Sequence, residues 1–334
     1  MKILYVIPDL KKISGGPLTR ITMFKKIFLN NDGLVIEKGN KLSRSIRARK
    51  IDFVYVESAT NRISLTDFIC LFFLRIYSKK VIVFIRDVYI ELFPEEYNTL
   101  RSKITLVLNR LSNLYLAIIS TSMAFPTERM GKVFFEKNNI FPKRDLFSLP
   151  PGTALERRIR ETPNFEKKLG LLYLGSTKYS NSGFDNFLKL SEIFSEHYNF
   201  FILSGDRELV ETLKEKPIIL NKVEHDQMIK YIEDNNIAYA IHTRPRNTYD
   251  DLTFPIKVLD FINMQMPFFT EKHLPLIDLL GDDYKLFNNL RELDNIHEII
   301  QNVSEIEYKK MMIFLYEVKL ENTYDDRFKK LCSQ

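Results

Sequence analysis

The sequence predicts an α/β protein made of two doubly wound domains. Short apolar segments alternate with longer helical segments, and this series runs twice along the chain. A length of 334 residues is too great for one comfortable core and suits two domains. Strands separated by helices form parallel sheets, in which ligands bind beyond the carboxyl ends of the strands. We therefore expect two Rossmann-like domains that face each other across a cleft.

Eight short apolar segments are predicted to be strands. They are residues 2–7, 53–58, 80–85, 116–121, 170–175, 199–205, 217–221 and 237–242. Between the first four and the last four lies SLPPGTAL, residues 148–155, whose prolines and glycine extend neither a helix nor a central strand. The predicted domains are residues 1–150 and 151–310. Residues 311–334 are expected to form a helix that packs back towards the first domain.

Composition indicates a cytoplasmic globular protein. Apolar residues make up 45% and charged residues 28%, and the two cysteines give neither a metal-binding spacing nor a disulfide framework. The first residues do not resemble a signal peptide, and the longest apolar run, residues 68–74, is far below the ~20 residues that span a bilayer. A net charge of +6 favours anionic partners such as a nucleotide diphosphate or an acidic lipid surface. No nucleic-acid-binding motif is present, so no nucleic-acid partner is expected.

The segment SLTDFICLFFLRIYSKK, residues 64–80, allows two interpretations. It is either a core helix or a helix at a membrane interface with basic residues at one end. A lipid-linked acceptor would suit the second interpretation, with the protein held peripherally at the inner membrane face.

In the first domain, two loops have residues suited to ligand binding. Gly15 and Gly16 follow the first strand and lead into a helix, so the backbone can approach an anion closely. The spacing is not GxGxxG, which disfavours a nicotinamide or flavin site. Arg86 and Asp87 follow the third predicted strand. A carboxylate there is suited to orient or deprotonate an acceptor hydroxyl, and the arginine to bind phosphate.

In the second domain, the candidates follow the first and last predicted strands. Small residues come after residue 174, followed by Lys178, which is suited to stabilise a departing diphosphate. A polar loop with Arg244, Arg246 and Asp251 follows the last strand, and a helix then begins near Pro255. The start of such a helix holds phosphate through its backbone N–H groups and dipole. Lys257 and Asp260 are three residues apart and lie on one side of this helix. They could bind a ligand together, or they could form a surface salt bridge with no ligand involved.

Taken together, these segments resemble a GT-B glycosyltransferase, most closely glycosyltransferase family 4. The resemblance covers nearly the whole chain at low similarity. KILYVIPDL with GGPLTRI is similar to the family's opening strand and glycine loop, and RDVYIELFP to an acceptor-domain stretch. SLPPGT stands where the family has its interdomain turn, and LLYLGS with SGFDNFLKL resembles the opening of the donor domain. The most specific segment is FPIKVLDFINMQMPFF, residues 254–269, which looks like the family's Pro-x-Lys-x-x-Glu-Tyr-x-x-x-Gly-x-Pro element.

The resemblance implies a transferase (EC 2.4) that moves a sugar from a nucleotide-activated donor, of UDP or GDP type, to a glycan, lipid-linked or other acceptor. It implies retention of configuration and no metal or other cofactor. The catalytic candidates are Asp87, Lys178 and Arg244. The donor-binding candidates are Gly15, Gly16, Gly175, Ser176, Arg246, Asp251, Pro255, Ile256, Lys257 and Asp260. The acceptor-binding candidates are Arg20 and Arg86.

The sequence also departs from the family pattern. Many members have two glutamates separated by seven residues, whereas this chain has Asp260 at the second position and Leu252 at the first. A small shift of the loop would allow Asp250 or Asp251 to serve as this acid. The departures leave two alternatives open: a catalytically degenerate GT-B protein that binds a nucleotide sugar or a partner, and a GT-B nucleotide-sugar epimerase.

Overall fold

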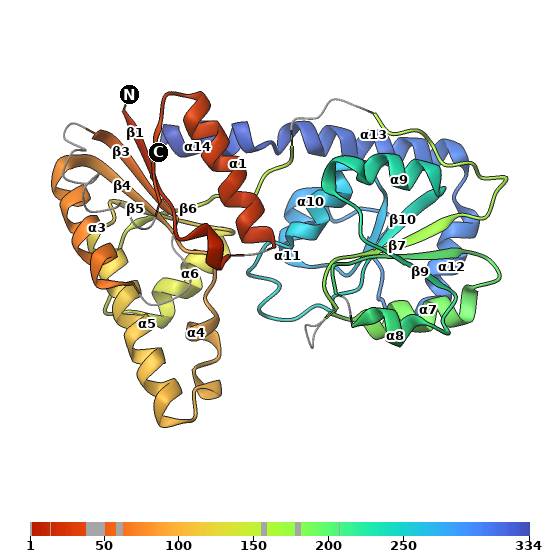
Figure 1. Ribbon diagram of the computed structural model, residues 1–334, viewed down its shortest axis with the longest axis horizontal. Coiled ribbons are helices and arrows are strands. Elements are labelled where there is room, and N and C mark those ends of the chain that lie inside the picture. The colour runs from red at the N-terminus through yellow and green to blue at the C-terminus, as the bar shows by residue number, and fades with distance from the viewer. Residues whose placement is uncertain are drawn as a thin grey trace. The chain divides into compact units, whose positions relative to one another are not determined.

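The computed structural model describes residues 2–13, 15–37, 51–57, 63–154, 159–177, 182–206 and 208–334. The chain forms two compact units (Figure 1). The first comprises Met1–Gly152, Leu252–Phe254 and Tyr324–Gln334, and the second comprises Thr153–Asp251 and Pro255–Thr323. Each unit is built on one parallel sheet, so the predicted pair of α/β domains is confirmed.

The first unit has a six-stranded sheet in the order β2-β1-β3-β4-β5-β6. Its strands are β1 (Ile3–Val6), β2 (Leu34–Ile36), β3 (Ile51–Glu57), β4 (Ser78–Phe84), β5 (Ser122–Phe125) and β6 (Asp145–Ser148). Its described α-helices are α1 (Gly16–Asn30), α3 (Leu65–Tyr77), α4 (Tyr89–Leu92), α5 (Leu100–Ile119), α6 (Glu128–Lys137) and α14 (Tyr324–Ser333).

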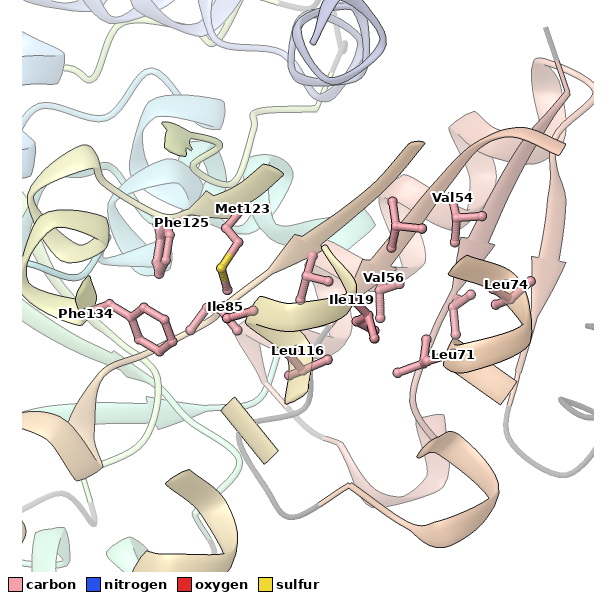
Figure 2. Packing of buried hydrophobic residues seen from close by; sticks show 14 of the residues in the cluster. Val54, Val56, Leu71, Leu74, Ile85, Leu116, Ile119, Met123, Phe125 and Phe134 are labelled. Atoms are coloured by element: carbon pink, nitrogen blue, oxygen red, sulfur yellow. The ribbon is translucent and has the colours of Figure 1, made fainter. Parts of the chain in front are cut away.

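Alternating side chains of the first sheet enter two separate apolar clusters, as the pleat of a strand requires. Leu4 and Val6 belong to the cluster that α3, α5 and α6 cover, whereas Tyr5 belongs to the cluster that α1 and α14 cover. Figure 2 shows the first cluster, where side chains of α3 and α5 lie against the strands. The sheet is therefore buried on both faces, as is usual for parallel sheets.

The second unit has a five-stranded sheet in the order β11-β10-β7-β8-β9. Its strands are β7 (Gly170–Leu174), β8 (Asn199–Leu203), β9 (Ile218–Asn221), β10 (Ile237–His242) and β11 (Phe268–Thr270). Its described α-helices are α7 (Phe184–Phe194), α8 (Leu209–Leu213), α9 (Met228–Asp234), α10 (Ile256–Asn263), α11 (Leu274–Leu280), α12 (Leu293–Asn302) and α13 (Glu305–Glu321). The helix expected to begin near Pro255 is α10, and Pro255 is its N-cap.

The structure corrects one predicted strand and divides one predicted helix. Residues 116–119 of the expected strand 116–121 are the last turn of α5, and the strand that follows is β5. A capping box between Thr99 and Ser102 starts this helix, which runs for 20 residues. At the C-terminus, α13 ends at Glu321 and α14 begins at Tyr324, so residues 311–334 are not one helix.

Candidate functional site

In the second sheet, the order of the strands changes direction between β7 and β10. From β7 the chain adds β8 and β9 on one side, and it then returns to add β10 and β11 on the other. The connections leaving β7 and β10 therefore run apart at the carboxyl edge, which is where open parallel sheets bind ligands. Helices α7 and α10 follow these two strands. This edge is the candidate site of the second unit.

Lys257, in the first turn of α10, reaches across the end of β7. Its Nζ lies 5.2 Å from the centre of the Tyr173 ring. Gly175 has a φ of +101°, and a Cβ at this position would lie 2.5 Å from Lys257 Cε and 2.8 Å from its Nζ. The absence of a side chain at Gly175 thus makes room for the amine. The sequence singled out both residues, and the structure brings them together.

The pKa of Lys257 is lowered from 10.5 to about 8, chiefly by burial and also by the nearby Arg244. Asp206 and Asp260 act in the opposite direction and favour the charged amine. Burial has removed part of the water around this ammonium group, and the nearby carboxylates compensate for only part of that loss. A bound anion would supply the missing stabilisation of the charge, so the group should bind an anion strongly. The amine is therefore suited to receive a phosphate group.

Asp206 connects the loops that follow β7 and β8. Its carboxylate accepts hydrogen bonds from Ser176 Oγ at 2.8 Å and from the backbone N–H of Thr177 at 2.9 Å. The N-cap of α8 is Glu208, so Asp206 does not cap this helix. Asp206 instead holds the Gly175–Thr177 loop and contributes negative charge beside Lys257. Ser176, which is expected to bind the donor, donates its hydroxyl hydrogen bond to Asp206.

The start of α7 lies directly against the segment after β10. Gly183, the N-cap of α7, has a φ of +65°, and a Cβ there would lie 1.8 Å from the carbonyl oxygen of Thr243. Thr243 Oγ1 donates a hydrogen bond to the carbonyl oxygen of Ser182 at 2.5 Å. The two loops at the change of strand order are thus fixed to each other, and glycine is the residue that permits this.

The polar loop after β10 is held by two ion pairs. Arg244 Nε lies 3.1 Å from Asp250 Oδ2, and Arg246 Nε lies 2.9 Å from Asp251 Oδ2. Asp251 also accepts a hydrogen bond from the backbone N–H of Leu274 at 3.0 Å. These carboxylates are therefore engaged in shaping the loop. Lys178, the third predicted cation, lies outside the described residues.

Leu252, at the position where the related pattern has its first glutamate, is an anchoring residue. Its side chain is 7% exposed and belongs to the core of the first unit. Its carbonyl oxygen accepts a hydrogen bond from Thr127 Oγ1 at 2.6 Å. Asp250 and Asp251, the two acids proposed for this role, are each paired with an arginine in the second unit.

Two buried histidines that the sequence reasoning did not select line the same edge. His242 Nδ1 lies 3.0 Å from Thr270 Oγ1, and the His273 Nε2 atom lies 3.0 Å from the carbonyl oxygen of Arg244. The ring centres are 5.7 Å apart. Burial is the main cause that lowers the pKa of both imidazoles. His242 ends a predicted strand, and this was the one sequence signal that could have indicated its place.

In the first unit, Arg86 and Asp87 lie together just beyond the end of β4. Because the strand ends at Phe84, the two side chains are not forced to opposite faces, and Arg86 Nε lies 3.7 Å from Asp87 Oδ2. Burial raises the pKa of Asp87, an effect that Arg86 opposes. Glu91, which the sequence reasoning passed over, is 2% exposed, and burial raises its pKa as well. Gly15, with a φ of +65°, precedes α1, which begins at Gly16.

Arg20 does not have the expected acceptor-binding position. It is 3% exposed, and its guanidinium forms an ion pair with Glu57 at 2.9 Å. It also donates to Tyr55 Oη at 2.9 Å and to the carbonyl oxygen of Leu149 at 3.1 Å, and it lies over the ring of Phe84. The residue faces inward from α1, so its charge joins the strands to the helix and is not presented to a ligand.

Comparisons with solved structures find the same architecture in other proteins. An alpha-glucosyltransferase in complex with UDP and a 13-mer DNA containing an HMU base has 11% sequence identity and a TM-score of 0.65, over 99% of this chain and 100% of that chain. A glycosyltransferase from Rickettsia africae has 13% identity and a TM-score of 0.65, over 99% and 97%. A trehalose-6-phosphate protein from E. coli bound with UDP-2-fluoro glucose has 11% identity and a TM-score of 0.64, over 99% and 98%. The chain has the GT-B fold.

No protein-family model and no curated protein sequence matches the chain. The likeness to GT-B structures therefore establishes the fold and leaves membership of family 4 a prediction. Among the described residues, no group of three or more histidine, cysteine, aspartate or glutamate side chains is arranged to hold a metal ion. No helix in the described part of the chain is both long and apolar enough to cross a bilayer.

Proposed function

We propose that the protein is a glycosyltransferase that moves a sugar from a nucleotide-activated donor to a hydroxyl of a glycan or lipid-linked acceptor. The observation that carries this proposal is the position of Lys257 at the change of strand order in the second sheet. Solved proteins of the same fold bind UDP or UDP-2-fluoro glucose, which supports a donor of this class.

In this proposal the donor diphosphate lies at the start of α10. Ile256 and Lys257 are the first residues of this helix, where the backbone N–H groups have no acceptor within the helix. The Lys257 ammonium provides the charge that stabilises the leaving diphosphate. Asp260, one turn further along, binds the ribose hydroxyls through its carboxylate. Arg244 acts on the same diphosphate after release from Asp250, or acts indirectly by lowering the pKa of Lys257.

The reaction breaks the bond between the anomeric carbon and the phosphate oxygen, and the electron pair leaves with the nucleoside diphosphate. A new bond forms to the acceptor oxygen on the same face of the sugar, and the acceptor proton passes to the departing phosphate. Asp87 orients the acceptor hydroxyl, and its Arg86 partner keeps a positive charge nearby. Positioning and electrostatic stabilisation supply the rate enhancement, without a metal ion. Retention, metal independence, a cytoplasmic location and the absence of a nucleic-acid partner are parts of this proposal.

A second candidate is a GT-B protein that binds the donor without turnover. Leu252 favours it, because this residue is committed to the core of the first unit and both neighbouring carboxylates are paired with arginines. Release of UDP or GDP from the matching nucleotide sugar by purified protein, in the presence of a chelator, separates the two functions. Binding without release supports the second candidate.

The primary test is binding of UDP, GDP and their sugar conjugates, measured by thermal shift and calorimetry. Asp260→Ala should weaken binding about tenfold or more, as expected for the loss of a hydrogen bond to a charged group. Asp294→Ala, which removes an exposed carboxylate from α12, serves as the matched control and should bind as the wild type does. If the wild type binds neither nucleotide class, the proposed function is wrong. If Asp260→Ala binds normally, the ribose assignment is wrong while the remainder stands.

A further inference from the structure

Helices α3 and α5 each have an apolar face that the fold leaves uncovered. Nine large apolar side chains on these two helices are exposed, with exposed fractions from 45% for Phe68 to 78% for Leu100. We call this set the outer apolar face. It consists of Leu65, Phe68, Phe72 and Ile76 on α3 and Leu100, Ile104, Val107, Leu111 and Ile118 on α5.

On α5 the exposed apolar positions are spaced by three, four or seven residues and so form one stripe along the helix. The buried residues Asn109, Ser112 and Leu116 lie on the opposite side. From Leu100 to Ile118 the stripe is about 27 Å long, at ~1.5 Å per residue. A helix that only covers a sheet needs one apolar face, and α5 has two.

The exposed faces of the two helices form one surface. Their inner residues, including Leu71, Leu74 and Leu116, belong to the same cluster on one face of the first sheet, as Figure 2 shows. The Phe68 and Tyr115 rings stack with centres 4.1 Å apart, and Tyr115 Oη donates to the Phe68 carbonyl oxygen at 2.7 Å. An exposed apolar surface of this extent is unusual for a protein that has no partner.

The charged residues of the two helices are almost all basic. Helix α5 contains Arg101, Lys103 and Arg110 and no acidic residue, and α3 contains Arg75 and Asp67. A partner that matches this surface must be apolar and must also have negative charge. In a dimer formed through this surface, the basic residues of one α5 would lie against those of the other α5, and the like charges would repel.

We propose that the outer apolar face docks on an anionic lipid bilayer. The apolar side chains enter the boundary between head groups and acyl chains, while the arginines and lysine lie among anionic head groups. The inner sides of both helices are packed against the first sheet, so their outer sides remain available to the bilayer surface. This inference rests on the first unit alone and does not depend on the proposed donor chemistry.

Flotation of the full chain with phosphatidylcholine vesicles, with and without phosphatidylglycerol, tests the proposal. The protein should float with the anionic vesicles, and added salt should weaken the association. Ile104→Gln with Val107→Gln should reduce binding about tenfold or more, because each substitution reduces the apolar area that the bilayer would bury. The matched control is Ile193→Gln with Ile313→Gln, which changes equally exposed residues on α7 and α13. This pair should float as the wild type does.

A charge test uses Arg75→Glu with Lys103→Glu, which should abolish the preference for anionic vesicles. Lys189→Glu with Lys310→Glu makes the same change in net charge on exposed helical sites of the second unit and should leave the preference intact. Failure of the wild type to float, or equal loss in both glutamine pairs, would overturn the proposal. A wild-type dimer that Ile104→Gln with Val107→Gln converts to a monomer, without vesicle binding, would assign the surface to a second copy instead.

Discussion

Replacement of Lys257 by methionine should make the protein more stable and at the same time weaken nucleotide binding. Methionine keeps the length and the apolar stem of lysine but removes the charge. In the folded protein the pKa of Lys257 is lowered from 10.5 to about 8, chiefly by burial. At ~1.36 kcal/mol per pKa unit, this difference corresponds to about 3 kcal/mol of destabilisation of the charged form. Partial exposure to solvent reduces the gain on removal to about 1–2 kcal/mol.

The pH dependence follows from the direction of the pKa change. Because the folded-state pKa lies below the unfolded one, the unfolded chain binds this proton more tightly between about pH 8 and 10.5. The penalty is therefore present in full below pH 8 and disappears as the pH approaches 10.5. In urea unfolding, Lys257→Met should have a higher free energy of unfolding than the wild type at pH 7, and the difference should shrink as the pH rises.

Nucleotide binding should change in the opposite direction. Loss of a charge-assisted contact to a phosphate should weaken UDP or GDP binding by about tenfold to a hundredfold. Wild-type affinity should fall as the pH rises above about 8, whereas Lys257→Met should lack this dependence. Lys189→Met, on the exposed side of α7, is the control and should change neither property. A variant that is less stable at pH 7, or that binds nucleotide as tightly as the wild type, would refute the argument.

Two further predictions concern the framework of the site. Gly183→Ala should destabilise the second unit by several kcal/mol, more than the ~1–3 kcal/mol of a strained φ, because its Cβ would lie 1.8 Å from the Thr243 carbonyl oxygen. Gly205→Ala, where a Cβ meets nothing within 4 Å, should change the urea midpoint little, and equal effects would contradict the explanation. Arg20→Met should cost about 3–5 kcal/mol by leaving Glu57 buried without its ion-pair partner, and adding Glu57→Gln should recover part of the loss. A purely additive double variant would show that the pair is not coupled.

The alternation of strands and helices was sufficient to predict the fold class, but not every boundary. The segment LAIIST was assigned to a strand because a short apolar run with two isoleucines has no helical period of its own. In the structure it ends a helix whose outer side is also apolar, so the usual polar face that identifies a surface helix is missing. The true strand, β5, has the sequence SMAF, which has little β-branched character.

The candidate site was predicted only in part. The sequence selected Lys257 and Gly175 separately, since each stands near the end of a strand, but their contact depends on how two loops far apart in sequence meet. The sequence does not single out Asp206, because an acidic residue after a strand is equally suited to cap the next helix, and only the position of Ser176 and Thr177 distinguishes the two roles. Arg20 was misplaced because a helical arginine is normally exposed, whereas this one has buried hydrogen-bond partners on β3 and in the loop after β6.

Helix α14 is synthesised last, yet it packs against α1, which is synthesised near the beginning. It contributes Tyr324 and Phe328 to the same cluster as Phe24 and Phe28 of α1, with ring centres 5.5 Å and 5.1 Å apart. The whole second unit is translated between the two helices, which at ~5–20 residues per second takes roughly ten to thirty seconds. During that interval the α1 aromatics have no cover from α14. A fragment ending at Gly152 would therefore leave these aromatic side chains permanently without the cover of α14.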